Sequence, residues 1–165
     1  MLYAVGDSHA FNIATQNSDN WINLAIPGKS STDKKIIEST DLLTPRSTVL
    51  VSMGSNDIAF SLKKARQKEH ILTIETIVNN IIKVVNLIKE KDCRPVFLLF
   101  PKNDIRSAGL LHPYSNDYQN KVRNRIKEEL ECHTVVEYDY GLADGVHYSI
   151  KSYQLIEKDI REKFI

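Results

Sequence analysis

The chain has 165 residues, of which 42% are hydrophobic and 26% charged, the balance of an ordinary soluble globular protein. This composition excludes a disordered tail, a collagen-like repeat and a small disulfide-dense scaffold, and the length predicts a single domain over residues 1–165. Lysine and arginine number 22 against 21 aspartate and glutamate residues, a net charge of +1, so no basic field indicates nucleic-acid binding.

The cysteines and the apolar runs indicate the cellular setting. Cys93 and Cys132 are the only cysteines and fit no metal-ligand spacing, so we expect reduced thiols in an intracellular protein, with a disulfide between them as the alternative. No apolar run approaches the roughly 18 residues that a membrane-spanning helix needs. The first residues lack the basic and apolar regions of a secretory signal. The sequence therefore predicts a cytoplasmic protein without membrane insertion.

Five short apolar runs, most of them closed by glycine or proline, predict β-strands in chain order at residues 2–5, 21–26, 48–53, 94–100 and 134–138. Between these runs, apolar residues that recur every three or four positions predict helices at 10–15, 32–39, 74–88, 118–130 and 150–164. Ser149 is the expected N-cap of the last helix. Strands that are apolar on both faces are typical of a parallel sheet. The alternation predicts an α/β protein in which a doubly wound sheet lies between two layers of helices.

Polar residues follow four of the predicted strands, at the edge where open parallel sheets bind ligands. These groups are Gly6-Asp7-Ser8-His9, Gly28, Gly54-Ser55-Asn56-Asp57 and Asp144-Gly145-Val146-His147. Because the carboxyl ends of parallel strands share one edge, we expect the four groups to converge.

The residue types in these groups fit acyl transfer through a serine nucleophile. A serine hydroxyl such as that of Ser8 needs an adjacent base, which the imidazole of His147 can supply. Asp144, three residues earlier, can orient that imidazole and stabilise its protonated form. The developing oxyanion needs preorganised donors, for which we expect the backbone N–H groups of Ser8 and Gly28 and the side-chain amide of Asn56.

Gly6-Asp7-Ser8, Gly28, Gly54-x-Asn56-Asp57 and Asp144-x-x-His147 resemble, in order and spacing, the four sequence blocks of the SGNH, or GDSL-type, hydrolases. The resemblance spans residues 6 to 147 and implies a flavodoxin-like fold with five parallel strands. It also implies Ser8 as nucleophile, His147 as base, Asp144 as its partner, an oxyanion hole of Ser8, Gly28 and Asn56, and no metal or cofactor. His9 departs from the pattern, because many members carry an aliphatic residue after the serine.

Each of these residues also has a structural alternative: Ser8 or Asn56 as a helix cap, Gly28 or Asp144 as a turn residue and His147 as an exposed loop residue. We expect Asp7 to bond local backbone amides, Asp57 to be structural, and the side chain of His9 to point away from the nucleophile.

The sequence predicts a serine esterase that hydrolyses short-chain esters, such as O-acetyl groups of a carbohydrate, through an acyl-enzyme on Ser8. An O-acyltransferase, a thioesterase or a lysophospholipase could use the same site, and a catalytically silent binding module is the alternative from another class. The polar residues Lys29, Lys102, Asn103 and Arg106 could line the pocket and favour an anionic substrate, or could be solvated surface residues.

Overall fold

The computed structural model describes residues 1–58, 73–102 and 115–164, and it contains one sheet of five parallel strands. The strands are β1 (Leu2–Gly6), β2 (Trp21–Asn23), β3 (Thr48–Ser52), β4 (Arg94–Leu98) and β5 (Thr134–Val136). They lie in the order β2-β1-β3-β4-β5. The predicted doubly wound parallel sheet is therefore confirmed.

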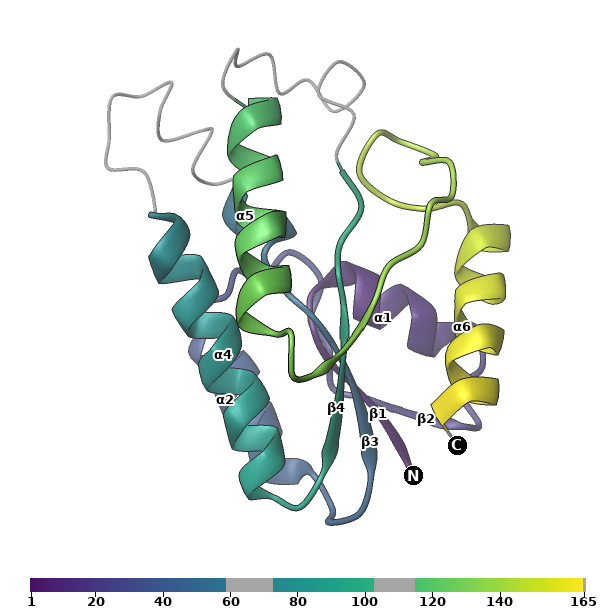
Figure 1. Ribbon diagram of the computed structural model, residues 1–165. Coiled ribbons are helices and arrows are strands. Elements are labelled where there is room, and N and C mark those ends of the chain that lie inside the picture. Colours follow the sequence, from purple (N-terminus) through teal and green to yellow (C-terminus); the bar gives the residue numbers. More distant parts are fainter. Residues whose placement is uncertain (59–72, 103–114, 165) are drawn as a thin grey trace.

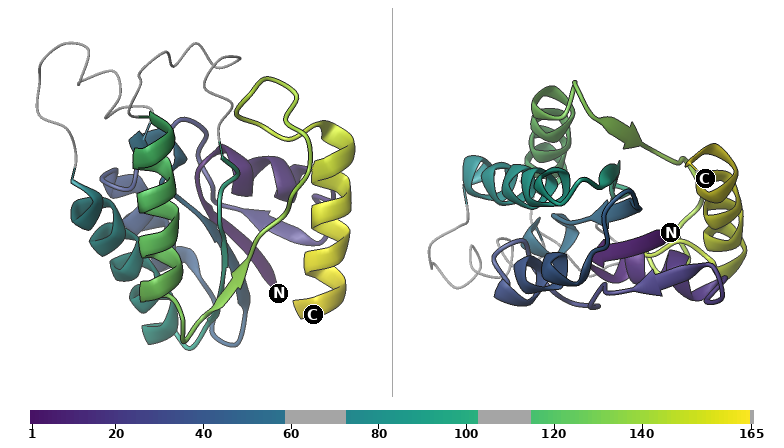
Figure 2. Two further views of the ribbon diagram at one scale, coloured as in Figure 1. Left: turned by 45° about the horizontal axis from the view of Figure 1, so that its top comes forward. Right: turned by 90° about the horizontal axis from the view of Figure 1, so that it is seen from below.

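Helices cover both faces of this sheet. In chain order they are α1 (Ser8–Thr15), α2 (Lys34–Ser39), the short 3-10 helix η1 (Thr40–Leu42), α4 (Ile74–Glu90), α5 (Ser115–Glu129) and α6 (Ile150–Phe164). Figure 1 shows α1 and α6 on one side of the strands and α2, α4 and α5 on the other. The view from below in Figure 2 separates α4 from α6 in the same way. The result is the predicted three-layer α/β/α arrangement.

Two separate cores hold the layers together, one on each face of the sheet. Along β1, Tyr3 and Val5 pack into the core under α2, α4 and α5, whereas Leu2 and Ala4 pack into the core under α1 and α6. Both faces of the strand are buried. This double burial is the reason that the sequence shows continuous apolar runs instead of polar–apolar alternation.

The ends of the elements differ from the prediction by a few residues. Helix α1 begins at Ser8 because Asp7 is its N-cap, with Asp7 Oδ1 accepting from the backbone N–H of His9 at 3.0 Å. The alternative of Ser8 as the cap is therefore wrong, and the expectation for Asp7 is confirmed. Ser149 Oγ accepts from the backbone N–H of Ser152 at 3.2 Å, as expected of an N-cap.

Both cysteines are free, with Cys93 buried and Cys132 exposed. Across 1–58, 73–102 and 115–164, no helix has the length and apolarity to cross a membrane. The same residues contain no cluster of three or more histidine, cysteine, aspartate or glutamate side chains that could hold a metal ion.

Candidate active site

A sharp turn at the end of β1 delivers Ser8 to the carboxyl edge of the sheet. Gly6 has a φ of +117°, and a Cβ atom there would lie 1.9 Å from the carbonyl oxygen of Ser52 on β3. Only glycine fits that approach. The backbone N–H of Asp7 then donates to the same carbonyl at 2.9 Å, and α1 starts at once with Ser8.

A compact turn before α6 presents His147. Leu142 and Tyr148 form an antiparallel bridge, and the backbone N–H of Ala143 donates to the carbonyl of His147 at 2.8 Å. Inside the turn, Asp144 Oδ1 accepts from the backbone N–H of His147 at 2.6 Å, and Asp144 Oδ2 lies 2.8 Å from His147 Nδ1. The spacing of three residues thus places carboxylate and imidazole together, as predicted.

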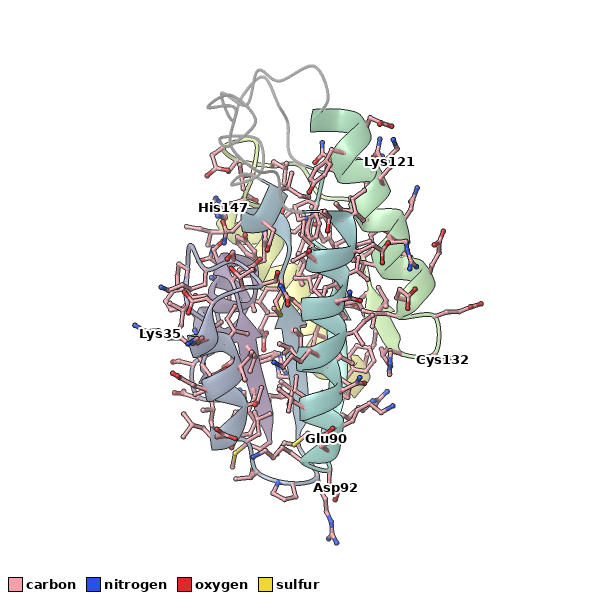
Figure 3. All side chains as sticks on the ribbon, turned by 90° about the vertical axis from the view of Figure 1, so that its left-hand side faces the viewer. Lys35, Glu90, Asp92, Lys121, Cys132 and His147 are labelled. Atoms are coloured by element: carbon pink, nitrogen blue, oxygen red, sulfur yellow. The ribbon has the colours of Figure 1, made fainter. Side chains whose placement is uncertain are left out.

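Ser8 and His147 meet although 139 positions separate them in the chain. Ser8 Oγ lies 3.0 Å from His147 Nε2. Figure 3 shows His147 toward the same end of the molecule as Lys121, whereas Glu90 and Asp92 lie at the opposite end. Because Asp92 lies two residues before the start of β4, the Ser8–His147 contact lies at the carboxyl edge of the strands, where ligands bind in open parallel sheets.

The ionisation of Asp144 determines which nitrogen of the His147 ring carries a proton. Desolvation opposes ionisation, but hydrogen bonds from the backbone and ring of His147 and from the backbone of Val146 outweigh it and lower the pKa of Asp144 to about 2. An ionised carboxylate only accepts hydrogen bonds, so Nδ1 of neutral His147 carries the proton. Nε2 is then free to accept the hydroxyl proton of Ser8.

The loop that contains Gly28 is fastened to the residues after β3. Asn56 Nδ2 donates to the carbonyl of Lys29 at 2.9 Å, and Asp57 accepts from both the backbone N–H and the hydroxyl of Ser31, at 2.9 and 2.6 Å. Asp57 is therefore structural, as expected. These bonds fix the Gly28 loop and the Asn56 side chain relative to each other.

The three expected oxyanion donors lie on the segments that these bonds connect: the backbone N–H groups of Ser8 and Gly28 and the side-chain amide of Asn56. The N–H of Ser8 lies at the first position of α1, where a helix supplies no acceptor. Asn56 keeps a second N–H beyond its bond to Lys29. The surroundings of the Gly28 backbone are open: the residue is exposed, has a φ of +78°, and a Cβ there would meet no atom within 4 Å. The backbone N–H of Ile26 donates to the carbonyl of Gly6 at 2.9 Å, which ties the Gly28 loop to the end of β1.

The four residues expected around the pocket have different positions. Lys29 Nζ lies 3.0 Å from Asp33, an ion pair with the next turn of chain. Lys102 is exposed and borders a cavity at the end of β4. Asn103 and Arg106 lie outside the described residues.

His9 is a part of the site that sequence reasoning did not identify. Its ring is fully buried, hydrogen-bonds Tyr153 of α6 through Nδ1 at 2.9 Å, and packs with its centroid 5.5 Å from that of His147. Desolvation, with a further contribution from His147, lowers the pKa of His9 to about 3, so the ring is neutral. The side chain does not reach the serine but supports the histidine that does. The one sequence feature that pointed to this contact is the position of Tyr153 on the apolar face of the predicted last helix.

No protein-family model matches the sequence, and neither does any curated protein. Solved structures, in contrast, match nearly the whole chain. A lipase/acylhydrolase from Enterococcus faecalis is 18% identical over 98% of this chain and 95% of its own, with a TM-score of 0.67. An acetyl xylan esterase is 12% identical, covers 99% of both chains and has a TM-score of 0.68. The C-terminal domain of Drosophila Oskar protein is 11% identical over 98% of this chain and 86% of its own, with a TM-score of 0.65.

These likenesses concern the fold. The chain has the α/β/α fold of the GDSL-type, or SGNH, hydrolases, as the sequence resemblance implies.

Proposed function

We propose that this protein is a serine esterase that hydrolyses short-chain carboxylic esters through an acyl-enzyme on Ser8. The observation that carries the proposal is the continuous contact from Ser8 Oγ to His147 Nε2, at 3.0 Å, and from His147 Nδ1 to Asp144 Oδ2, at 2.8 Å. Hydroxyl, imidazole and carboxylate in this order form an activated nucleophile.

In the first half of the reaction, Ser8 Oγ attacks the ester carbonyl carbon while His147 Nε2 takes the hydroxyl proton. The tetrahedral intermediate carries its negative charge on the former carbonyl oxygen, which the N–H groups of Ser8, Gly28 and Asn56 stabilise. His147 then gives the proton to the leaving alcohol as the carbon–oxygen bond of the ester breaks. Asp144, ionised throughout, stabilises the transient imidazolium.

In the second half, His147 removes a proton from water as the water oxygen attacks the acyl-enzyme. Collapse of the second tetrahedral intermediate returns the proton to Ser8 Oγ and releases the carboxylic acid. An alcohol acceptor in place of water would give an acyltransferase through the same steps.

An acetyl group on a carbohydrate is the substrate that we favour. Among the described residues the rim of the site is open, because Gly28 and Asp144 are exposed and the side chain of His147 keeps 35% of its surface accessible. A long acyl chain gains its binding free energy from apolar burial, which an open rim does not supply. Ester hydrolysis in general is also supported by the fold neighbours, whose names include a lipase/acylhydrolase and an acetyl xylan esterase.

The test is a panel of acetylated sugars, acyl thioesters and lysolipids, with released acid measured for the wild type and for Ser8→Ala. We expect release from acetylated sugars by the wild type only. An alcohol acceptor in the mixture separates hydrolysis from transfer. Absence of turnover on every ester, with a folded wild-type protein, would contradict the proposal and favour a binding module.

A further inference from the structure

A cavity of about 450 Å³ lies at the same edge of the sheet as the proposed catalytic residues. Its described walls come from the end of β4, from α5 and from the segment that follows β5. Among the residues that the structure describes, the polar lining consists of Lys102, Arg123, Glu137, Tyr138, Asp139 and Tyr140. Figure 1 shows α5 and the segment between β5 and α6 on either side of the end of β4. Nothing in the proposed chemistry at Ser8 uses this cavity.

We infer that this cavity binds a second sugar ring, adjacent to the sugar that carries the ester; the inference rests on the proposed esterase function. The cavity belongs to the ligand-binding edge of the sheet, since it opens where β4 and β5 end. With the order β1-β3-β4-β5 and a strand spacing of ~4.8 Å, it lies roughly 10–15 Å from the end of β1 and hence from Ser8. An acetyl group does not span that distance, but a disaccharide does.

One wall of the cavity continues into the turn that holds His147. The ring of Tyr140 meets the ring of Tyr148 edge-on at 6.3 Å, and the hydroxyl of Tyr148 donates to the carbonyl of Tyr138 at 2.8 Å. Tyr148 is the neighbour of His147 in the chain. A ligand in the cavity therefore rests on the segment that presents the proposed base, and is held in a fixed relation to it.

The charges of the cavity favour a neutral polar ligand. Among the lining residues that the structure describes, Lys102 and Arg123 balance Glu137 and Asp139. The exposed charges of Lys102 and Asp139 also make the cavity a poor site for an acyl chain, because they would lose hydration without gaining partners. A sugar offers hydroxyl groups that both donate and accept.

Two of the charged side chains in the lining already have hydrogen-bond partners, and two are available to bind a ligand. Arg123 is buried and bonds the carbonyl of Phe100 and the carboxylate of Glu137, so this pair forms a fixed floor. Lys102 and Asp139 are exposed and make no hydrogen bond or ion pair with any residue that the structure describes. They can donate to and accept from sugar hydroxyls.

Tyr140 adds an exposed aromatic residue to the lining, whereas the hydroxyl of Tyr138 donates to Asp159 of α6 at 2.6 Å. The rings of Tyr138 and Tyr140 stack at 6.0 Å with an interplanar angle of 8°, and Tyr140 keeps 37% of its surface exposed. A tyrosine ring offers a flat apolar face beside a polar hydroxyl. The C–H face of a pyranose ring is complementary to that surface, so Tyr140 supplies packing while Lys102 and Asp139 supply hydrogen bonds.

The experiment compares kcat/KM for three substrates: singly acetylated xylobiose, acetylated xylose and p-nitrophenyl acetate. We expect the wild type to prefer the disaccharide over the monosaccharide. Tyr140→Ala should lower the ratio of kcat/KM on the disaccharide to that on p-nitrophenyl acetate by about tenfold. Tyr140→Phe, which keeps the ring, should retain the ratio, and Asp139→Asn should lower it. Leu42→Ala, an exposed side chain on η1, is the control outside both sites.

An equal loss on all three substrates in Tyr140→Ala would overturn the inference, because it would mean that the ring only supports the His147 turn. Equal wild-type preference for monosaccharide and disaccharide would overturn it as well. Binding of unacetylated xylobiose to the wild type, followed by NMR titration, separates the two proposals. Saturable binding that Tyr140→Ala abolishes, without turnover of any ester, would leave the sugar site standing and the esterase proposal wrong. Absence of binding together with normal ester turnover would leave the esterase proposal standing and the sugar site wrong.

Discussion

Asp7 and His9, the two neighbours of Ser8 in the chain, should make opposite contributions to the pH dependence of folding. Both are fully buried. Desolvation raises the pKa of Asp7 from 3.8 to about 7 and lowers the pKa of His9 from 6.5 to about 3. The informative perturbations are Asp7→Asn, which can still cap α1 through its side-chain oxygen, and His9→Leu, which replaces the imidazole by an aliphatic side chain.

The signs follow from which state binds the proton. Between pH 3.8 and about 7 the folded protein holds a proton on Asp7 that the unfolded chain releases, so this stabilisation is present in acid and is lost as the pH rises. Between pH 6.5 and about 3 the unfolded chain binds a proton on His9 that the folded protein excludes, so stability falls as the pH falls.

The two effects are of similar size. On acidification from pH 6.5 to pH 5, Asp7 raises the free energy of unfolding by ~2 kcal/mol and His9 lowers it by ~2 kcal/mol, so they nearly cancel in the wild type. Relative to the wild type over this interval, His9→Leu should therefore gain about 2 kcal/mol and Asp7→Asn should lose about 2 kcal/mol.

The assay is urea unfolding of the three proteins at both pH values, with the free energy of unfolding obtained by linear extrapolation. Only the difference between each variant and the wild type is interpreted, so that the titration of the rest of the chain cancels. The double variant should return to the behaviour of the wild type. Parallel pH curves for all the proteins would refute the reasoning, because neither buried group would then titrate as its environment requires.

Three further substitutions test the geometry of the site. Gly6→Ala should lower the free energy of unfolding, measured in urea, by more than ~2 kcal/mol, because the new Cβ atom meets the Ser52 carbonyl. Gly28→Ala is the matched control: its Cβ has open space around it, so the free energy of unfolding should fall by only ~1 kcal/mol. Asn56→Ala should lower kcat by about 10²–10³-fold with a small change in Tm, and full activity would exclude the amide as an oxyanion donor. Asp144→Asn should lower kcat by about 10⁴-fold. Because the pKa of Asp144 is about 2, its protonation should leave the wild-type rate unaffected at pH 5, and a rate that tracks its titration there would contradict this environment.

The sequence predicts the layers of the fold better than the ends of its strands. The run at 48–53 is apolar because both faces of β3 are buried, and β3 spans Thr48–Ser52. The runs at 21–26 and 94–100 extend past β2 and β4, which end at Asn23 and Leu98. Burial continues at Leu99 and Phe100 after strand pairing stops, so hydrophobicity alone does not reveal where a strand ends.

The site was predictable where its chemistry depends on residue type, and unpredictable where it depends on packing. The spacing of Asp144 and His147 predicts their contact, because a single turn joins them. The position of His9 depends on the packing of α6 against α1, which brings Tyr153 within 2.9 Å of its ring. Lys29 and Asp33 precede α2 and lie outside any helix, so their spacing of four residues does not by itself predict their ion pair.

The central claim is that Ser8 is a nucleophile activated by His147, and covalent labelling tests it most directly. A fluorophosphonate probe should add one adduct to the intact protein, and peptide mass spectrometry should locate it on Ser8. The adduct should be absent from Ser8→Ala and form much more slowly on His147→Ala. A folded wild-type protein that remains unlabelled, or that is labelled at another residue, would contradict the account.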